Sequence, residues 1–325
     1  MKTSTRAGLA VLAMSGVLLA AAGCDPKDGD PVSATSRKAS AAPATTAAAL
    51  APVTANSPYV ALGDSYTAGP NIPGQTGTPA GCDRSDRNYP SLVAQNLGIK
   101  AADFRDMSCS GATIADLSSA QSTGDGDNPA QLSALSGTTR LVTLGIGGND
   151  IDFSAIIKKC VTAGVFYYAT GNGKYTGDTP CKDQYISGGT DTVRQKIDAA
   201  GEQLADALGD IKRRAPNAAV YVVGYPAALP SEAGNCGREM GLAPGDVTFL
   251  HQEQQRLNTM LKQAAQAAGA GYVDTYTPSV GHDACSARST RWIEPMIPLA
   301  PAAPVHPNAR GERGMADAVL DKLKR

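Results

Sequence analysis

Four separated residues of this chain have types that suit attack on a carbonyl group: Ser65, Gly111, Asn149 and His306. A serine hydroxyl is a poor nucleophile until an imidazole accepts its proton, and the tetrahedral intermediate then needs hydrogen-bond donors aimed at its oxyanion. His306 would supply the imidazole. The backbone N–H groups of Ser65 and Gly111, with the side-chain amide of Asn149, would supply the donors. The four residues therefore predict a serine nucleophile with a general base and an oxyanion hole.

His306 is the preferred base among the three histidines of the chain. His251 lies in a Gln-rich helical pattern, which favours a packing role. His282 lies beside a cysteine and is expected to be structural, with a place in the wall of the cleft as the alternative. His306 precedes Pro307, a residue favoured at the first position of a helix. Its ring would therefore lie free at a loop-to-helix junction, where Ser65 can reach it.

The elements that position these residues alternate between strand-like and helix-like patterns, which predicts a parallel sheet covered by helices on both faces. Ser65, the segment 108–113 and Asn149 each follow a predicted strand, and ligands bind at the carboxyl ends of strands in such sheets. The predicted strands are 59–62, 103–107, 141–146, 219–224 and 271–275, and the predicted helices are 89–98, 192–215, 244–268 and 311–324. The segment between Cys160 and Cys181 lacks clear periodicity and is expected to be a surface loop, or else a lip of the cleft.

The chain resembles the SGNH (GDSL-type) hydrolases, whose four motifs contain Ser, Gly, Asn and His. These occur here in the same order as Ser65, Gly111, Asn149 and His306. The resemblance covers residues 58–325 and extends in particular to the secreted actinobacterial esterases and lipases with three disulfides. It implies an α/β fold, a flavodoxin-like three-layer α/β/α sandwich with a central parallel sheet. It also implies hydrolysis of carboxylic esters through an acyl-enzyme intermediate, with neither a metal nor another cofactor.

The chain departs from the pattern of these hydrolases beside the histidine. Many members have an aspartate three residues before it, which fixes the imidazole tautomer. Here that position is Ala303, and no carboxylate lies between Glu294 and Glu312. Because some relatives hold the histidine with a main-chain carbonyl, we expect a Ser–His dyad in which the His306 ring donates to a carbonyl of segment 292–304. The acidic residues that could substitute are Glu294, Asp283 and Asp274.

Seven cysteines leave one unpaired if the protein is exported and the others form disulfides. A lipid on Cys24 would account for the odd one, and the spacing of the remaining six leaves their pairing open. The resemblance implies sequential pairing. Its three disulfides would be Cys82–Cys109, Cys160–Cys181 and Cys236–Cys285.

The amino terminus is predicted to direct export. Lys2 and Arg6 precede an apolar segment that is short for a bilayer span, and small residues follow, which is typical of a signal peptide over 1–23. Its end resembles a lipobox, with Ala21 where leucine is usual, so acylation of Cys24 is expected. The alternative is ordinary signal-peptidase cleavage, which would leave this cysteine as a free thiol.

Residues 24–57 are rich in Ala, Thr, Ser and Pro and have no apolar periodicity. They are predicted to form a disordered tether between the lipidated cysteine and a hydrolase domain over 58–325. The expected location is therefore extracellular, at the outer face of the cell membrane. The membrane would be contacted only through the amino-terminal lipid.

The composition of the 325-residue chain, 42% hydrophobic and 18% charged, is sufficient for one sizeable core. A net charge of -1 and the lack of any long run of Lys or Arg give no electrostatic basis for binding nucleic acid. We expect a monomer that acts on a small-molecule or lipid ester. Two alternatives are open: a polysaccharide or small-molecule deacetylase of the same fold, and a non-catalytic lipoprotein that binds a ligand.

Overall fold

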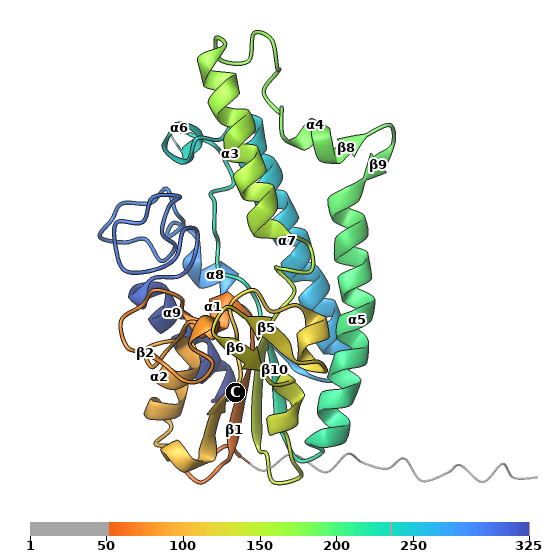
Figure 1. Cartoon of the computed structure of the whole chain (residues 1–325), viewed down its shortest axis with the longest axis vertical. Helices are drawn as coiled ribbons and strands as arrows, with labels where there is room; N and C mark the ends of the chain where they lie inside the picture. Colours follow the sequence, from red (N-terminus) through yellow and green to blue (C-terminus); the bar gives the residue numbers. More distant parts are fainter. Residues whose placement is uncertain (1–51, 235, 325) are drawn as a thin grey trace, which may run out of the picture. The chain divides into compact units, whose positions relative to one another are not determined.

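A parallel five-stranded sheet forms the centre of the computed structural model, which describes residues 52–234 and 236–324 (Figure 1). Its order is β11-β10-β7-β1-β4, so the chain moves outward from β1 to β4 and then returns to the other side of β1. This reversal creates a switch point between β1 and β7, where open α/β sheets bind ligands. The strands are β1 (Tyr59–Gly63), β4 (Phe104–Asp106), β7 (Leu141–Gly145), β10 (Ala219–Val223) and β11 (Gly271–Val273).

Two pairs of helices cover the two faces of the sheet. Tyr59 and Ala61 belong to a core cluster with residues of α2 (Tyr89–Asn96) and α9 (Ala309–Leu323). The alternate residues of β1, Val60 and Leu62, pack in a second cluster. That cluster includes residues of α5 (Thr192–Arg214) and α7 (Pro244–Ala267). The alternation of β1 side chains between the two clusters follows from the two-residue period of a strand. The predicted three-layer α/β/α sandwich is confirmed.

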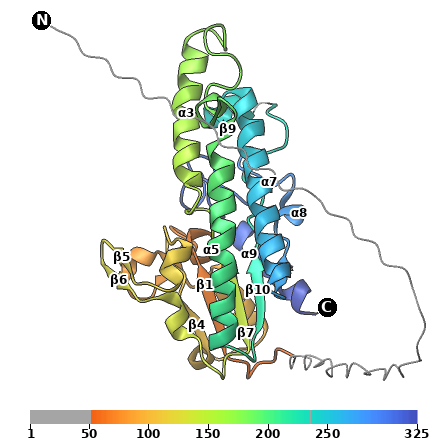
Figure 2. The same ribbon diagram turned by 90° about the vertical axis from the view of Figure 1, so that its right-hand side faces the viewer.

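The expectation of a loop between Cys160 and Cys181 was wrong for residues 161–169, because helix α3 (Phe153–Ala169) continues through Cys160; residues 170–181 contain no helix or strand. Apolar residues occur around most of α3, and Val165 and Phe166 are exposed, so the sequence shows no one-sided pattern there. In Figure 1 and Figure 2, α5 and α7 extend past the sheet, and α3 runs beside them there. A hydrogen bond of 3.1 Å from the Tyr167 hydroxyl to Asp178 ties the loop after α3 back to the helix.

The ends of several predicted elements shift by one to three residues. A 3₁₀ turn, η2 (Ala101–Asp103), occupies the start of the expected strand 103–107. The last helix begins at Ala309 because the Asn308 side chain accepts from the backbone N–H groups of Arg310 and Gly311, at 2.9 and 3.1 Å. Pro307 therefore precedes the helix cap instead of occupying the first helical position, which corrects that expectation.

Short elements connect the main ones. The four-residue or five-residue helices are α1 (Ser65–Ala68), α4 (Lys182–Tyr185), α6 (Cys236–Met240) and α8 (Tyr276–Ser279). The small antiparallel pairs are β2 (Gln75–Thr76) with β3 (Arg84–Ser85), β5 (Gln121–Thr123) with β6 (Gly126–Asn128), and β8 (Ile186–Ser187) with β9 (Thr190–Asp191). The other 3₁₀ turns are η1 (Ala80–Cys82), η3 (Ile114–Leu117) and η4 (Gln131–Ala134). None of the helices in the described part of the chain has the length and apolar character that crossing a membrane requires.

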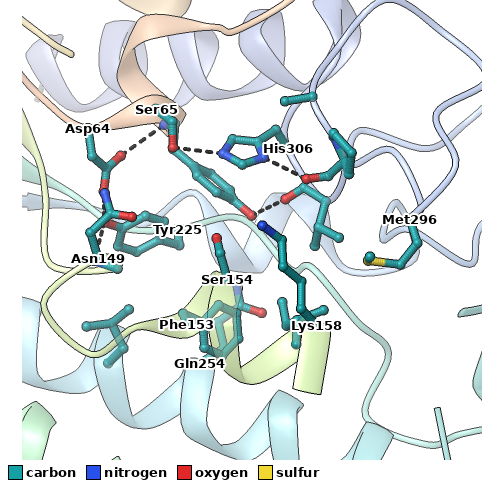
Figure 3. Close-up of a pocket in the computed structure, with 17 residues that line it drawn as sticks. Asp64, Ser65, Asn149, Phe153, Ser154, Lys158, Tyr225, Gln254, Met296 and His306 are labelled. Atoms are coloured by element: carbon teal, nitrogen blue, oxygen red, sulfur yellow. Dashed lines mark hydrogen bonds between the residues drawn. The ribbon is translucent and has the colours of Figure 1, made fainter. Parts of the chain in front are cut away.

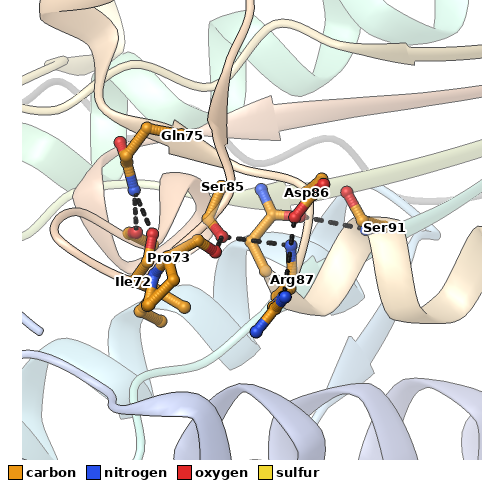
Figure 4. Close-up of polar contacts among 9 residues, drawn as sticks. Ile72, Pro73, Gln75, Ser85, Asp86, Arg87 and Ser91 are labelled. Carbon is orange, nitrogen blue, oxygen red and sulfur yellow. Dashed lines mark hydrogen bonds and ion pairs between the residues drawn. The ribbon is translucent and has the colours of Figure 1, made fainter. Parts of the chain in front are cut away.

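Side chains stiffen the connection between α1 and α2 (Figure 4). The Gln75 amide donates to the carbonyls of Gly69 and Ile72, at 3.1 and 2.7 Å. The Ser85 hydroxyl donates to the Pro73 carbonyl at 3.1 Å. These bonds satisfy backbone carbonyls that lie outside helices and strands, so the segment can pack without regular structure.

Three disulfides join parts of the chain that the sheet leaves unconnected. Cys82–Cys109 links the turn after β4 to η1, and Cys160–Cys181 links α3 to the residue before α4. Cys236–Cys285 links α6 to the segment that follows α8. These are the pairs that the resemblance implies. Each bond typically contributes about 2–4 kcal/mol, mainly by restricting the unfolded chain.

Candidate active site

Ser65 is the first residue of α1 and follows β1 directly. The side chain of Asp64 caps this helix by accepting from the Tyr66 N–H at 2.9 Å. Gly63 is required before it, because a Cβ there would overlap the Thr67 side chain and the Gly145 carbonyl oxygen. The tight strand-to-helix turn therefore presents the Ser65 hydroxyl at the carboxyl end of the sheet.

His306 lies opposite Ser65, with 2.7 Å between its Nε2 and the serine Oγ (Figure 3). Its Nδ1 lies 2.8 Å from the Pro304 carbonyl oxygen. A carbonyl only accepts, so Nδ1 carries the hydrogen and the neutral ring leaves Nε2 free to accept from the Ser65 hydroxyl. The contact with Pro304 has the geometry expected of a carbonyl from the segment 292–304. The arrangement can remove a proton from Ser65.

The backbone on either side of His306 is held by a short antiparallel contact. The Glu294 N–H donates to the His306 carbonyl, and the Val305 N–H donates to the Glu294 carbonyl, both at 3.0 Å. The Tyr66 hydroxyl also donates to the Val305 carbonyl at 2.6 Å, which links the histidine segment to the helix of Ser65. These contacts fix the position of the ring through the main chain.

Three acidic side chains that the sequence offers as partners of His306 have other hydrogen-bond partners. Glu294 is fully buried and accepts from the Leu299 and Ala300 N–H groups and from the Asn308 amide. The other two accept from backbone N–H groups close to them in sequence. Asp283 accepts from the Cys285 N–H, and Asp274 accepts from the Thr277 N–H. None of the three carboxylates forms a hydrogen bond with the His306 ring.

Burial favours the neutral form of the base. It lowers the pKa of the His306 imidazole below its usual value; the hydrogen bond to Pro304 opposes this shift, and the positive charge of Lys158 adds to it. A neutral imidazole at neutral pH is the form that accepts a proton from a serine.

Asn149 and Gly111 follow β7 and β4 and are joined through Ala112. The Asn149 amide donates to the Ala112 carbonyl at 2.8 Å. Gly111 has a φ of 81°, a left-handed conformation that favours glycine. Its N–H has no acceptor among the residues the structure describes. The Asp150 carboxylate, next to Asn149, accepts from the Ile114 N–H, at 3.0 and 3.2 Å.

A cavity of about 260 Å³ opens beside Ser65 and His306 (Figure 3). Asn149 also lines it, whereas Gly111 does not. Much of its wall is apolar, and the side chains responsible come from α3, from α7 and from the loop before His306. These apolar side chains are Phe153, Ile157, Leu257 and Met296. No group of three or more metal-ligating side chains occurs within 52–234 and 236–324.

A family model described as the GDSL-like Lipase/Acylhydrolase family matches residues 61–313 of this chain. The chain belongs to this family. The family resemblance drawn from the four motifs is thereby confirmed, and the chain is a carboxylic ester hydrolase.

Curated relatives extend the match along most of this GDSL-family hydrolase. Lipase 2 of Streptomyces coelicolor is 42% identical over 282 residues, which cover 86% of this chain and 90% of that protein. An esterase of Streptomyces scabiei is 30% identical over 299 residues, with coverage of 82% and 86%.

Solved structures of similar fold support the family assignment. Phospholipase A1 from Streptomyces albidoflavus NA297 matches with a TM-score of 0.65 at 26% identity, covering 81% of this chain and 98% of that one. An extracellular lipase from Streptomyces rimosus matches with a TM-score of 0.64 at 26% identity, covering 82% and 99%.

Two parts of the GDSL-family site were missed from sequence. One is the wall that the first turns of α3 contribute, because no element was predicted for residues 153–159. The other is Tyr225, whose buried hydroxyl donates to the Asp64 carboxylate and accepts from the Gly148 N–H at 2.8 Å. This hydroxyl bridges the turn of Ser65 and the turn of Asn149. Burial raises the pKa of Asp64 to about 7, and the bond from Tyr225 opposes that rise. A tyrosine just after a predicted strand carries no signal of this role.

Proposed function

We propose that this GDSL-family hydrolase is an exported serine esterase or lipase that cleaves carboxylic esters through an acyl-enzyme intermediate. The observation that carries the proposal is the 2.7 Å contact between Ser65 Oγ and His306 Nε2 in the wall of an apolar cavity. Nucleophile and base within hydrogen-bond reach, with the base oriented by a third group, are the parts that such chemistry needs.

The reaction begins when Ser65 Oγ attacks the ester carbonyl carbon and its proton passes to His306 Nε2. The Pro304 carbonyl stabilises the imidazolium through the Nδ1 hydrogen. The tetrahedral intermediate collapses, and Nε2 gives the proton to the leaving alkoxide. Water then attacks the acyl-enzyme, with His306 taking one of its protons and returning it to Ser65 Oγ. The products are a carboxylic acid and an alcohol, and the enzyme is regenerated.

The oxyanion would be stabilised by the N–H groups of Ser65 and Gly111 and by the Asn149 amide. An amide NH₂ has two hydrogens, so the bond from Asn149 to Ala112 leaves one of them for the substrate. One such donor is worth a factor of about 10²–10³ in kcat in a well-studied serine protease.

The apolar wall supports a substrate with an alkyl acyl chain, because burying each methylene contributes about 0.8 kcal/mol. An acetyl group would leave much of this apolar wall unused. The relatives named lipase, esterase and phospholipase A1 support the same substrate class. Profiling p-nitrophenyl esters from acetate to laurate tests this: a steep preference for acetate would favour the deacetylase alternative.

Export and anchoring form the second part of the proposal. The three disulfides are typical of proteins that fold in an oxidising compartment, which supports export. The signal peptide over 1–23, the acylated Cys24 and the tether that continues to residue 57 are proposed from sequence; residues 1–51 lie outside the described residues. The protein would then be a monomer that is attached to the membrane only through the lipid on Cys24. If the mature parent protein partitions into the detergent phase and Cys24→Ala does not, the result would support the lipid anchor. Partitioning of both proteins into the aqueous phase would contradict it.

Ser65→Ala is the direct test of the mechanism. Hydrolysis of p-nitrophenyl butyrate should fall by at least about 10³-fold with little change in melting temperature. Ser119→Ala, which changes an exposed serine, is the matched control and should keep full activity. An organophosphonate should label the parent protein and not Ser65→Ala. Turnover retained by Ser65→Ala would refute the nucleophile, and failure to label the parent would favour a non-catalytic binding protein.

A further inference from the structure

Two hydrogen-bond donors on α3 face the cavity without a partner in the described chain. Ser154 and Lys158 are one helical turn apart and line the same wall as Phe153 and Ile157. Within 52–234 and 236–324, neither the Ser154 hydroxyl nor the Lys158 ammonium forms a hydrogen bond, and Lys158 forms no ion pair. Both groups are therefore available to a ligand.

The charge of the cavity wall is positive near these two residues. Lys158 has the only lysine or arginine side chain among the lining residues, and Asp64 has the only acidic one. Asp64 is buried and bound by the Tyr225 hydroxyl, and it forms no ion pair with Lys158. An anionic group entering the cavity would meet a cation with no competing carboxylate.

Lys158 belongs to the part of the cavity wall that faces the pair of Ser65 and His306. Figure 3 shows Ser154 and Lys158 projecting from α3 toward the pair of Ser65 and His306, with Asn149 on the far side of the serine. The charge of Lys158 is also close enough to affect the titration of His306. Because His306 gives its proton to the leaving alkoxide, the alcohol part of an ester must lie beside it.

We propose that Ser154 and Lys158 form an anion subsite that selects esters whose alcohol part carries a phosphate diester or a carboxylate. The inference rests on the proposed function and extends it to a substrate class. A neutral ester gains nothing from Lys158, which stays in water. An anionic one gains a charge-assisted hydrogen bond from the ammonium and a second bond from the hydroxyl.

The test compares matched anionic and neutral esters below their micelle concentrations. One pair is dihexanoylphosphatidylglycerol with dihexanoylglycerol, and the other is 3-butyryloxybenzoate with its methyl ester. Lys158→Gln should lower kcat/KM for the anionic member by about fivefold or more, mainly through KM, and change the neutral member by less than about twofold. Ser154→Ala should shift the same ratio in the same direction by a smaller factor.

Lys159→Gln is the matched control, since it removes the same charge from the next residue of α3. The Lys159 ammonium lies over the Tyr185 ring, 4.9 Å from its centroid, and does not line the cavity. A loss confined to the phosphate pair would assign the subsite to phosphate diesters, and a loss confined to the carboxylate pair would assign it to carboxylates. An unchanged anionic-to-neutral ratio in Lys158→Gln, or an equal change in Lys159→Gln, would overturn the subsite. If the parent protein hydrolyses no member of either pair, the proposed function itself fails.

Discussion

Removing the phenol oxygen of Tyr225 should weaken the proposed oxyanion hole while leaving the substrate cavity intact. This hydroxyl lies between the Asp64 carboxylate and the Gly148 N–H. Gly148 precedes Asn149, and Asp64 precedes Ser65. The Tyr225 hydroxyl therefore sets the distance between the turn that carries the nucleophile and the turn that carries a proposed oxyanion donor. Tyr225→Phe keeps the ring and deletes both bonds.

The loss of stability in Tyr225→Phe should depend on pH. Burial raises the pKa of Asp64 to about 7, so this carboxyl is neutral near pH 5 and ionised near pH 8.5. The lost bond is worth about 0.5–1.5 kcal/mol to a neutral group and about 1.5–3 kcal/mol to a charged one. Leaving the Gly148 N–H unpaired costs a further ~1–3 kcal/mol at both values of pH. We expect the variant to lose about 1 kcal/mol more at pH 8.5 than at pH 5.

Activity should fall through kcat. In the proposed mechanism the substrate atom that Asn149 stabilises is the developing oxyanion, so kcat for p-nitrophenyl butyrate should fall by about tenfold or more with KM nearly constant. Urea unfolding at the two pH values gives the stability change, and initial rates on fully folded protein give kcat and KM.

Tyr221→Phe is the control, because Tyr221 is a half-buried residue of β10 whose hydroxyl bonds to no described residue. It should unfold and turn over like the parent protein. If Tyr225→Phe keeps the parental kcat, or loses the same stability at both values of pH, the bridging role of this hydroxyl is wrong.

Three further outcomes follow from the buried titratable groups and the histidine segment. Glu294→Gln and Asp283→Asn should lower stability but keep kcat within about tenfold, because neither side chain contacts the His306 ring; a loss of 100-fold or more, about 2.7 kcal/mol, in either would refute the dyad. The acidic limb of kcat/KM should have its midpoint below about 6.5, because burial lowers the pKa of His306; a midpoint above this value would contradict a buried base. Burial raises the pKa of Glu253 to about 7, so the folded state binds this proton more tightly than the unfolded state does, and stability should fall as pH rises from about 4.5 to 7. Calorimetry should show that Glu253→Gln flattens this dependence, and an unchanged slope would exclude Glu253 as its source.

The sheet and its four main covering helices could be predicted because their patterns are local. β1 and β7 are short apolar runs ending in glycine, and α5 and α7 have clear amphipathic repeats. Helix α3 could not be predicted, because it buries Ile156 and Ile157 near its start and exposes Val165 and Phe166 near its end. The spacing of apolar residues identifies a helix only when one face of that helix is buried along its whole length.

Some residues of the candidate site could likewise be predicted from sequence, and others could not. Ser65 and His306 stand out by type and position, whereas the bridge made by Tyr225 joins residues that lie 161 and 77 positions away in sequence. No local pattern encodes such a contact. The segment whose carbonyl meets the His306 ring could be predicted from the absence of a nearby acid, but selecting Pro304 required the course of the backbone.

In the proposed dyad, that course lets the neutral Pro304 carbonyl orient the His306 ring as a carboxylate would. Pro304 is only two residues before His306, so the contact is set by the φ and ψ angles of a very short segment. Val305, between them, has a φ of 58°, which costs a β-branched residue about 1–3 kcal/mol. The surrounding bonds hold it there: Val305 donates to Glu294 and accepts from Tyr66, and the buried Glu294 side chain accepts from Asn308. In the proposed dyad a strained backbone turn thus takes the place of the acid absent beside the histidine, and the main chain of Glu294 helps to hold that turn.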